Sequence, residues 1–160
     1  MLHIRQAFQE DSLSAQELIF RIWHDEYGFD VSLHDAPDLG NLSLSYPGHN
    51  ALFLVAFQDN RLVGTAAYSL LTQSTCVLKR FFVQIDVRRT GIGQQLFNEL
   101  YERLLGQHQG NPFSLYLSTK RDDAKSAKAF YLKNGFRIIK QKDLPSGFPF
   151  FYQDDLFMVK

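Results

Sequence analysis

The sequence has a single cysteine and no excess of charge of either sign. Cys76 is the only cysteine among 160 residues, which excludes an intramolecular disulfide and a zinc site built from several cysteines. Lys plus Arg and Asp plus Glu number 17 each, so a polyanion such as duplex DNA gains little long-range attraction. We therefore expect no nucleic-acid partner and no metal site.

Long apolar runs are also missing. Polar side chains already appear within residues 1–6, and no stretch approaches the roughly 18 apolar residues that a membrane span needs. We therefore expect a soluble, cytoplasmic protein without a secretory leader or a membrane partner. Aromatic residues, in contrast, are abundant, with 15 Phe and 7 Tyr, and they supply apolar surface for one compact domain over residues 1–160.

Alternating and continuous apolar stretches predict a run of strands. A capping box at Ser14 and Glu17 predicts the start of a helix after the first strand. Residues 27–50 lose periodicity among glycines and prolines, which indicates a short helix and irregular loops. The turn-forming pair at 59–60 predicts a hairpin. Strands are expected over residues 2–5, 51–57, 61–71, 76–87, 113–117, 136–139 and 150–159.

Helical spacing returns in the second half of the chain. A long amphipathic helix is predicted from residue 92 to the glycines at 106 and 110. Asp123 can cap a further helix, which Gly135 ends. The resulting order of elements is a helix, several strands, two strand–helix units and a closing hairpin. This order implies an α+β fold, with a mixed sheet covered by helices.

A basic, glycine-containing turn lies between a strand and the long helix, at residues 83–93. Gly91 and Gly93 allow close approach of the backbone to a ligand, and the first N–H groups of the helix favour a phosphate. Arg88 and Arg89 can add charge-assisted hydrogen bonds. Two glutamines follow Gly93 where a P-loop has Lys and Ser or Thr, and Leu96 replaces the third glycine of a dinucleotide fingerprint, so both nucleotide sites are disfavoured.

The spacing Arg88-x-x-Gly91-x-Gly93 resembles the acyl-CoA signature of the GNAT superfamily of N-acetyltransferases. A second element, the helix and turn at residues 127–136, is similar to the family's helix followed by Tyr-x-x-x-Gly-Phe. The resemblance extends over about residues 51–136 and returns in the last strand. It implies a GNAT-like central mixed, mostly antiparallel sheet of about seven strands flanked by helices. It also implies direct transfer of acetyl from acetyl-CoA to a primary amine of a small molecule, amino acid, peptide or protein in a ternary complex.

The resemblance further implies which residues bind acetyl-CoA. Backbone N–H groups of the turn would hold the pyrophosphate, Phe82 and Val83 would pair with pantetheine, and Tyr131 would donate a proton to the thioester sulfur. By pattern alone, Tyr131 is as compatible with packing as with catalysis, and Gly91 and Gly93 fit an ordinary tight turn. The implied cofactor-binding residues are Phe82, Val83, Arg88, Arg89, Thr90, Gly91, Ile92, Gly93, Gln94, Ser126 and Tyr131.

The general base stays open at this point. The family often has Glu where this chain has Val77, so our hypothesis is that Glu26, at the end of the first helix, takes the proton. A domain that senses acyl-CoA without catalysis is the alternative function. Cys76 is interpreted as a core residue, because no neighbouring His is evident in the sequence. The alternatives to Glu26 as base are His24, Asp25, His49 and Asp154.

The acceptor is expected to lie against the parts of the chain that resemble the family least, residues 23–50 and 144–152. The aromatic segment at residues 148–152 is either a core element or an exposed association patch, so a homodimer is one possible assembly.

Overall fold

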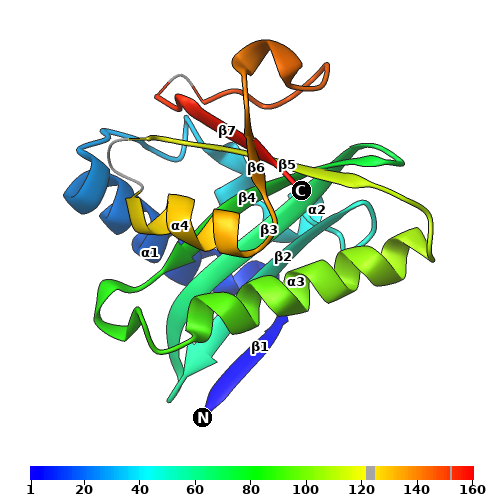
Figure 1. Ribbon diagram of the computed structural model, residues 1–160. Coiled ribbons are helices and arrows are strands. Elements are labelled where there is room, and N and C mark those ends of the chain that lie inside the picture. Colours follow the sequence, from blue (N-terminus) through cyan, green and yellow to red (C-terminus); the bar gives the residue numbers. More distant parts are fainter. Residues whose placement is uncertain (122–124, 152) are drawn as a thin grey trace.

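The computed structural model describes residues 1–121, 125–151 and 153–160. Its seven strands form one sheet in the order β1-β2-β3-β4-β5-β7-β6 (Figure 1). Neighbouring strands are antiparallel except β4 and β5, which are parallel, so the expected mixed, mostly antiparallel α+β sheet is confirmed. The strands are β1 Leu2–Gln6, β2 Ala51–Gln58, β3 Arg61–Thr72, β4 Thr75–Val83, β5 Ser114–Thr119, β6 Arg137–Ile139 and β7 Leu156–Val159.

Helices cover both faces of this sheet. In Figure 1, α3 and α4 lie on one face, and α1 and α2 lie on the other. Within the described ranges, every helix falls short of the length and hydropathy that a bilayer span needs. The helices are α1 Ser12–Tyr27, α2 Leu42–Ser45, α3 Ile92–His108 and α4 Lys125–Lys133, with short 3-10 turns η1 Gln9–Asp11, η2 Pro37–Gly40, η3 Ile85–Val87 and η4 Gln141–Asp143.

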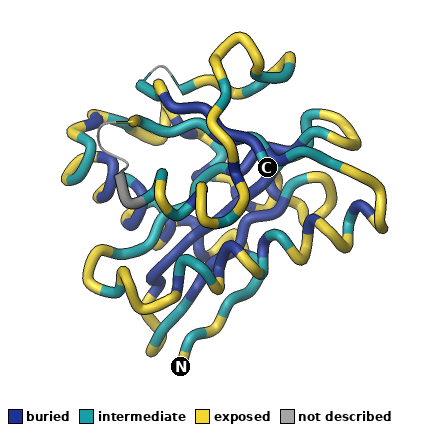
Figure 2. The backbone as a smooth tube through the Cα atoms, in the orientation of Figure 1, coloured by how far each residue is buried: buried dark blue, intermediate teal, exposed yellow. Residues whose placement is uncertain are grey.

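The sheet divides the core into two apolar clusters, and the central strands between these clusters are mostly buried, as Figure 2 shows. On one face, the apolar stripe of α3 packs against β3, where Gly64 lies beneath the helix. A Cβ at Gly64 would lie 3.2 Å from both Leu96 Cδ2 and the Phe82 carbonyl oxygen. Glycine at this position therefore lets α3 approach the sheet closely.

Local signals explain most element boundaries. Asp59 and Asn60 both adopt positive φ, at 51° and 64°, as a two-residue hairpin turn between β2 and β3 requires. Gly135, with φ of 90°, follows the end of α4. The predicted cap Asp123 lies outside the described residues.

The start of α1 corrects the sequence prediction. The helix begins at Ser12, so Ser14 lies exposed inside its first turn and the capping box predicted there is wrong. Asp11 supplies the interactions instead: its carboxylate accepts the Phe8 N–H at 2.7 Å and forms a bidentate ion pair with Arg5 at 2.7 and 3.0 Å. These contacts close the 3-10 turn η1, which leads directly into α1 at Ser12.

Other boundaries also differ from the prediction, and the differences at β4, α3 and β7 have a structural cause. β4 ends at Val83, because residues 85–87 form the turn η3. α3 runs through Gly106 to His108, and Gln109 then takes a left-handed conformation with φ of 49°. β7 covers only Leu156–Val159, because the aromatic segment before it packs against α1, where Phe151 stacks on Trp23.

Candidate active site

The sheet splits between β4 and β5. Their parallel pairing joins Thr75, Cys76 and Val77 to the start of β5 and then stops. In the described part of the chain, the edge of β4 from residue 78 to residue 83 that faces β5 has no strand partner, although its other edge continues along β3. An unpaired strand edge offers backbone N–H and C=O groups to a ligand.

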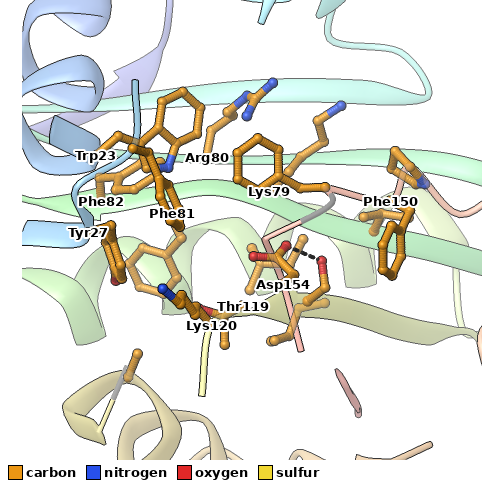
Figure 3. A pocket seen from close by; sticks show the side chains of 18 of the residues that line it. Trp23, Tyr27, Lys79, Arg80, Phe81, Phe82, Thr119, Lys120, Phe150 and Asp154 are labelled. Carbon is orange, nitrogen blue, oxygen red and sulfur yellow. Dashed lines mark hydrogen bonds between the residues drawn. The ribbon is translucent and has the colours of Figure 1, made fainter. Parts of the chain in front are cut away.

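Two cavities lie at this split. The larger one has a volume of about 310 Å³ and extends between β4, β5, α1 and the segment before β7 (Figure 3). The smaller one has a volume of about 220 Å³ and runs toward the glycine-containing turn at the start of α3. The two cavities share one wall, which consists of Tyr27, Phe81, Phe82, Ala127 and Tyr131.

The glycine-containing turn has the geometry of an anion site. Arg89 and Gly91 adopt left-handed conformations, with φ of 64° and 89°, and Gly91 caps the 17-residue helix α3. The helical hydrogen bond from Gln95 N to the Gly91 oxygen, at 3.0 Å, leaves the N–H groups of Ile92, Gly93 and Gln94 without helical acceptors. Those N–H groups and the helix dipole favour an anion at this end of the smaller cavity.

Arg88 and Thr90 fix the shape of the turn. The Thr90 hydroxyl donates to the Val87 oxygen at 2.5 Å. Arg88 Nε donates to the Val83 oxygen at 2.9 Å, and its two terminal nitrogens reach the Glu26 carboxylate at 2.6 and 2.8 Å. Glu26 therefore lies in the wall of the smaller cavity, with both oxygens bound by Arg88.

The side chain of Gln94 connects two helices. Its amide exchanges hydrogen bonds with Asn134, at 2.8 and 3.1 Å, and also donates to Asn98 at 2.8 Å. These bonds join the start of α3 to the end of α4. Ser126 belongs to α4, but its side chain lies outside the described part of the structure.

A β-bulge shapes β4 at the split. Thr65 pairs with Phe82 and Ala67 with Lys79, so one residue of β3 faces two residues of β4. Arg80 lies in this bulge with φ of 55°, and the Thr65 hydroxyl donates to its carbonyl oxygen at 2.7 Å. The extra residue changes the alternation of side chains along the strand.

Because of the bulge, two successive cations point to the α1 face of the sheet. Lys79 Nζ lies 5.7 Å from the Tyr46 ring centroid, and the Arg80 guanidinium lies 5.3 Å from that of Trp23. Phe81, the next residue, turns to the other face and contacts Tyr131 with its ring. The sequence pattern gave no sign of this arrangement, since the stretch reads as an uninterrupted strand.

Arg80 is held by a largely buried ion pair. Its Nε and Nη2 donate to Asp38 at 3.0 and 2.8 Å, and the Tyr46 hydroxyl donates to the same carboxylate at 2.5 Å. Burial by itself would raise the pKa of Asp38, but the hydrogen bonds from Arg80 and Tyr46 outweigh it and the pKa is lowered. The network connects η2 to the bulge and so stabilises the wall of the larger cavity.

Tyr131 lies at the junction of the two cavities. It is 8% exposed and packs edge-on against Phe81, Phe130 and Phe136. Burial raises the pKa of its phenol, and the nearby Tyr27 hydroxyl and Asp154 carboxylate raise it further. Tyr131 therefore stays protonated at neutral pH, as a proton donor must be.

Asp154 projects into the larger cavity from the loop before β7, as Figure 3 shows. Its carboxylate accepts a hydrogen bond from the Ser118 hydroxyl at 2.6 Å. Burial raises the pKa of Asp154 to about 6, and the neighbouring Asp155 adds to the shift, although Ser118 and Arg80 oppose it. Such a pKa suits a general base near neutral pH.

The other sequence candidates for the base lie elsewhere. His24 and Asp25 contact each other at 2.9 Å on the exposed face of α1, and His49 is exposed in the loop before β2. None of these three residues lines either cavity. Asp154 was only one alternative among several in the sequence, because nothing in the local pattern indicates that its loop returns to β5.

The aromatic segment before β7 forms part of the cavity wall. Phe151 stacks on Trp23, with ring centroids 6.0 Å apart, and lies 5.5 Å from the Phe29 ring. Phe150 is 47% exposed and stacks on Phe157 at 5.9 Å. The segment therefore bridges α1 and β7, and association of two copies through it stays a prediction.

Cys76 has a histidine neighbour that the sequence analysis missed. Its Sγ lies 3.8 Å from His108 Nε2, while His108 Nδ1 lies 2.7 Å from the Leu104 oxygen. Burial raises the pKa of Cys76 to about 12, so the thiol stays protonated. Both side chains lie outside the two cavities, and the interpretation of Cys76 as a core residue is confirmed.

Within the described residues, no group of three or more His, Cys, Asp or Glu side chains is placed to hold a metal ion.

Comparisons with known proteins match this architecture. The family model described as acetyltransferase (GNAT) domain matches residues 49–138. A GNAT-family acetyltransferase from Staphylococcus aureus Mu50 superposes with a TM-score of 0.92 at 30% sequence identity, covering 100% of this chain and 98% of that one. An acetyltransferase from Streptococcus agalactiae gives a TM-score of 0.89 at 21% identity, covering 99% and 97%.

A more distant structure was solved with a ligand. The PaiA N-acetyltransferase from Thermoplasma acidophilum, in complex with coenzyme A, has a TM-score of 0.74 at 20% identity and covers 100% of this chain and 98% of that one. Comparison with curated protein sequences gave no significant match. The family match and the Staphylococcus structure establish that this chain belongs to the GNAT acetyltransferase family and is an acyltransferase.

Proposed function

We propose that the protein transfers an acetyl group from acetyl-CoA to a primary amine by direct attack in a ternary complex. The observation that carries this proposal is the shared wall of the two cavities at Tyr131. A donor that lies in the smaller cavity and an acceptor that lies in the larger one would meet there. The coenzyme A complex of the Thermoplasma relative supports acetyl-CoA as the donor.

Acetyl-CoA would bind through main-chain groups for most of its length. Its pyrophosphate would accept hydrogen bonds from the N–H groups at the start of α3, with Arg89 adding charge. Its pantetheine amides would pair with the free edge of β4 at Phe82 and Val83. Arg88, which follows η3, donates hydrogen bonds to both oxygens of the Glu26 carboxylate. We therefore assign Glu26 to positioning Arg88 rather than to proton transfer.

Asp154 would act as the general base and Tyr131 as the general acid. The acceptor ammonium gives one proton to the Asp154 carboxylate, and the nitrogen lone pair then bonds to the thioester carbonyl carbon. The C–S bond breaks while the Tyr131 hydroxyl gives its proton to the departing sulfur. The nitrogen loses its second proton through water, and that proton restores the Tyr131 phenol. The products are the N-acetyl amine and CoA, and Asp154 releases the proton that it accepted to water.

Two measurements test this function. Calorimetric titration with acetyl-CoA, with NAD and ATP as controls, is expected to give saturable binding of acetyl-CoA alone. Release of free CoA thiol in the presence of a panel of primary amines would then demonstrate transfer. Binding without CoA release from any amine would favour the acyl-CoA sensor. Absence of acetyl-CoA binding would refute the proposed donor site at residues 88–93.

A further inference from the structure

Charged side chains of both signs line the larger cavity. Three of them, Arg80, Asp35 and Lys120, interact with other groups of the protein. Arg80 is bound by the bidentate ion pair with Asp38. Asp35 is exposed at the rim, where Ser32 donates two hydrogen bonds to its carboxylate at 2.9 and 3.2 Å. Lys120 lies over an aromatic ring at 5.5 Å and has a further interaction within the protein.

Two opposite charges remain without an ionic partner in the described part of the chain. Asp154 has the Ser118 hydroxyl as its hydrogen-bond donor and forms no ion pair. Lys79 is half-buried, and its Nζ lies near the Tyr46 ring with no carboxylate within 4.0 Å. Burial lowers the pKa of Lys79 and the neighbouring Arg80 lowers it further, while Asp38, whose carboxylate is bound by Arg80, opposes the shift. An anionic ligand would stabilise such a cation.

We infer that the acceptor is a primary amine that also carries a carboxylate, and that Lys79 binds this carboxylate while Asp154 binds the amine. This inference rests on the proposed function, which places the amine at Asp154 and Tyr131. In Figure 3 the charged ends of Lys79 and Arg80 lie on one side of the view, and the Asp154 carboxylate lies apart from them. A ligand that carries both an ammonium and a carboxylate supplies an opposite charge to each of these two groups.

The walls between the two charges indicate the rest of the acceptor. They are rich in aromatic side chains, which come from α1 and the loop after it, from β4 and from the segment before β7. A volume of about 310 Å³ is at the lower end of small-molecule sites, which commonly span roughly 300–1,000 Å³. The acceptor class is therefore a small amino carboxylate with an apolar, preferably aromatic, body. The aromatic residues concerned are Trp23, Phe29, Phe82, Phe148 and Phe151.

Two pairs of compounds test this inference. Phenylalanine is compared with phenethylamine, and 4-(aminomethyl)benzoate with 4-methylbenzylamine, so that each pair differs by a carboxylate. Initial rates of CoA release give the ratio of kcat/KM within each pair for the native protein. Calorimetric titration of the same four compounds, with and without CoA, gives the corresponding ratio of Kd without any turnover.

The variants are Lys79→Met, Lys79→Arg and, as a matched control, Lys142→Met on the exposed turn η4. The native protein is expected to prefer the carboxylate member of at least one pair by about tenfold or more, as loss of one charge-assisted hydrogen bond predicts. Lys79→Met should reduce this preference about tenfold. Lys79→Arg should keep most of it, and Lys142→Met should keep all of it.

The outcomes separate the inference from the proposed function. Equal use of both members of each pair by the native protein would overturn the inference and leave the acetyltransferase function standing. An unchanged preference in Lys79→Met would overturn the role of Lys79. If acetyl-CoA itself does not bind, the proposed function fails, and the ratio of Kd values still decides whether this cavity selects a carboxylate.

Discussion

Replacing Asp154 by Asn tests the proposed base through two properties that should change in opposite directions. Asn has nearly the same shape as Asp, and its carbonyl oxygen can still accept the hydrogen bond from the Ser118 hydroxyl. It cannot take a proton from the acceptor ammonium. Loss of a general base typically reduces turnover about 10²- to 10⁴-fold. We therefore expect Asp154→Asn to lose activity to that extent while binding acetyl-CoA normally.

The stability of the same variant should increase above pH 6. The pKa of Asp154 is about 6 in the fold, against 3.8 for an unperturbed Asp, so the folded protein holds this proton more tightly than the unfolded chain does. Its ionisation therefore destabilises the fold as pH rises from about 4 to above 6. A difference of about 2 units corresponds to at most about 3 kcal/mol. Asn carries no such charge, so that cost disappears.

The assays are kcat/KM between pH 5 and 9 and thermal unfolding at pH 4 and pH 8. For the native protein, kcat/KM should rise with pH and level off above an apparent pKa near 6. The Tm of Asp154→Asn should exceed the native Tm at pH 8 and approach it at pH 4. Asp143→Asn, an exposed substitution on η4, is the control. An unchanged acid limb in Asp154→Asn, or an equal gain in Tm at both pH values, would refute the assignment.

Three other substitutions test the donor side and the walls of the site. Tyr131→Phe should lower kcat by about 10²-fold or more and leave the Kd of acetyl-CoA nearly unchanged, measured by CoA release and calorimetry. Gly64→Ala should lower the free energy of unfolding in urea by about 1–3 kcal/mol, because the added Cβ would lie 3.2 Å from two atoms. In Gly106→Ala the added Cβ has no atom within 4 Å, so this control should be neutral or stabilising. Asp38→Ala should lower the free energy of unfolding by about 3–5 kcal/mol, because it leaves the Arg80 guanidinium unpaired. The double variant Asp38→Ala with Arg80→Met should regain part of that stability.

Sequence periodicity was sufficient for the fold class and for most of its elements. The apolar face of α1, at Leu18, Ile19, Ile22 and Trp23, is buried as the 3.6-residue spacing indicates. The hairpin turn at residues 59–60 and the glycine after α4 act through their own backbone conformations. These signals are local, so they can be read without knowledge of the rest of the chain.

Features that depend on distant contacts were missed or misplaced. The bulge at Arg80 requires a positive φ in a residue that rarely adopts one, and distant Asp38 holds its side chain. β7 inserts between β5 and β6, a strand order that no local spacing encodes.

The same distinction applies to the proposed site, because local signals indicate its donor side and do not indicate its acceptor side. The donor side is a contiguous strand, turn and helix, and it lies inside the region matched by the family model, residues 49–138. The acceptor cavity takes Trp23, Phe29, Phe151 and Asp154 from outside that region. The proposed base and most of the apolar wall therefore come from segments outside the region that the family model matches. Selectivity for the acceptor should accordingly change with substitutions in these segments and in Lys79, while acetyl-CoA binding should depend on the turn at residues 88–93.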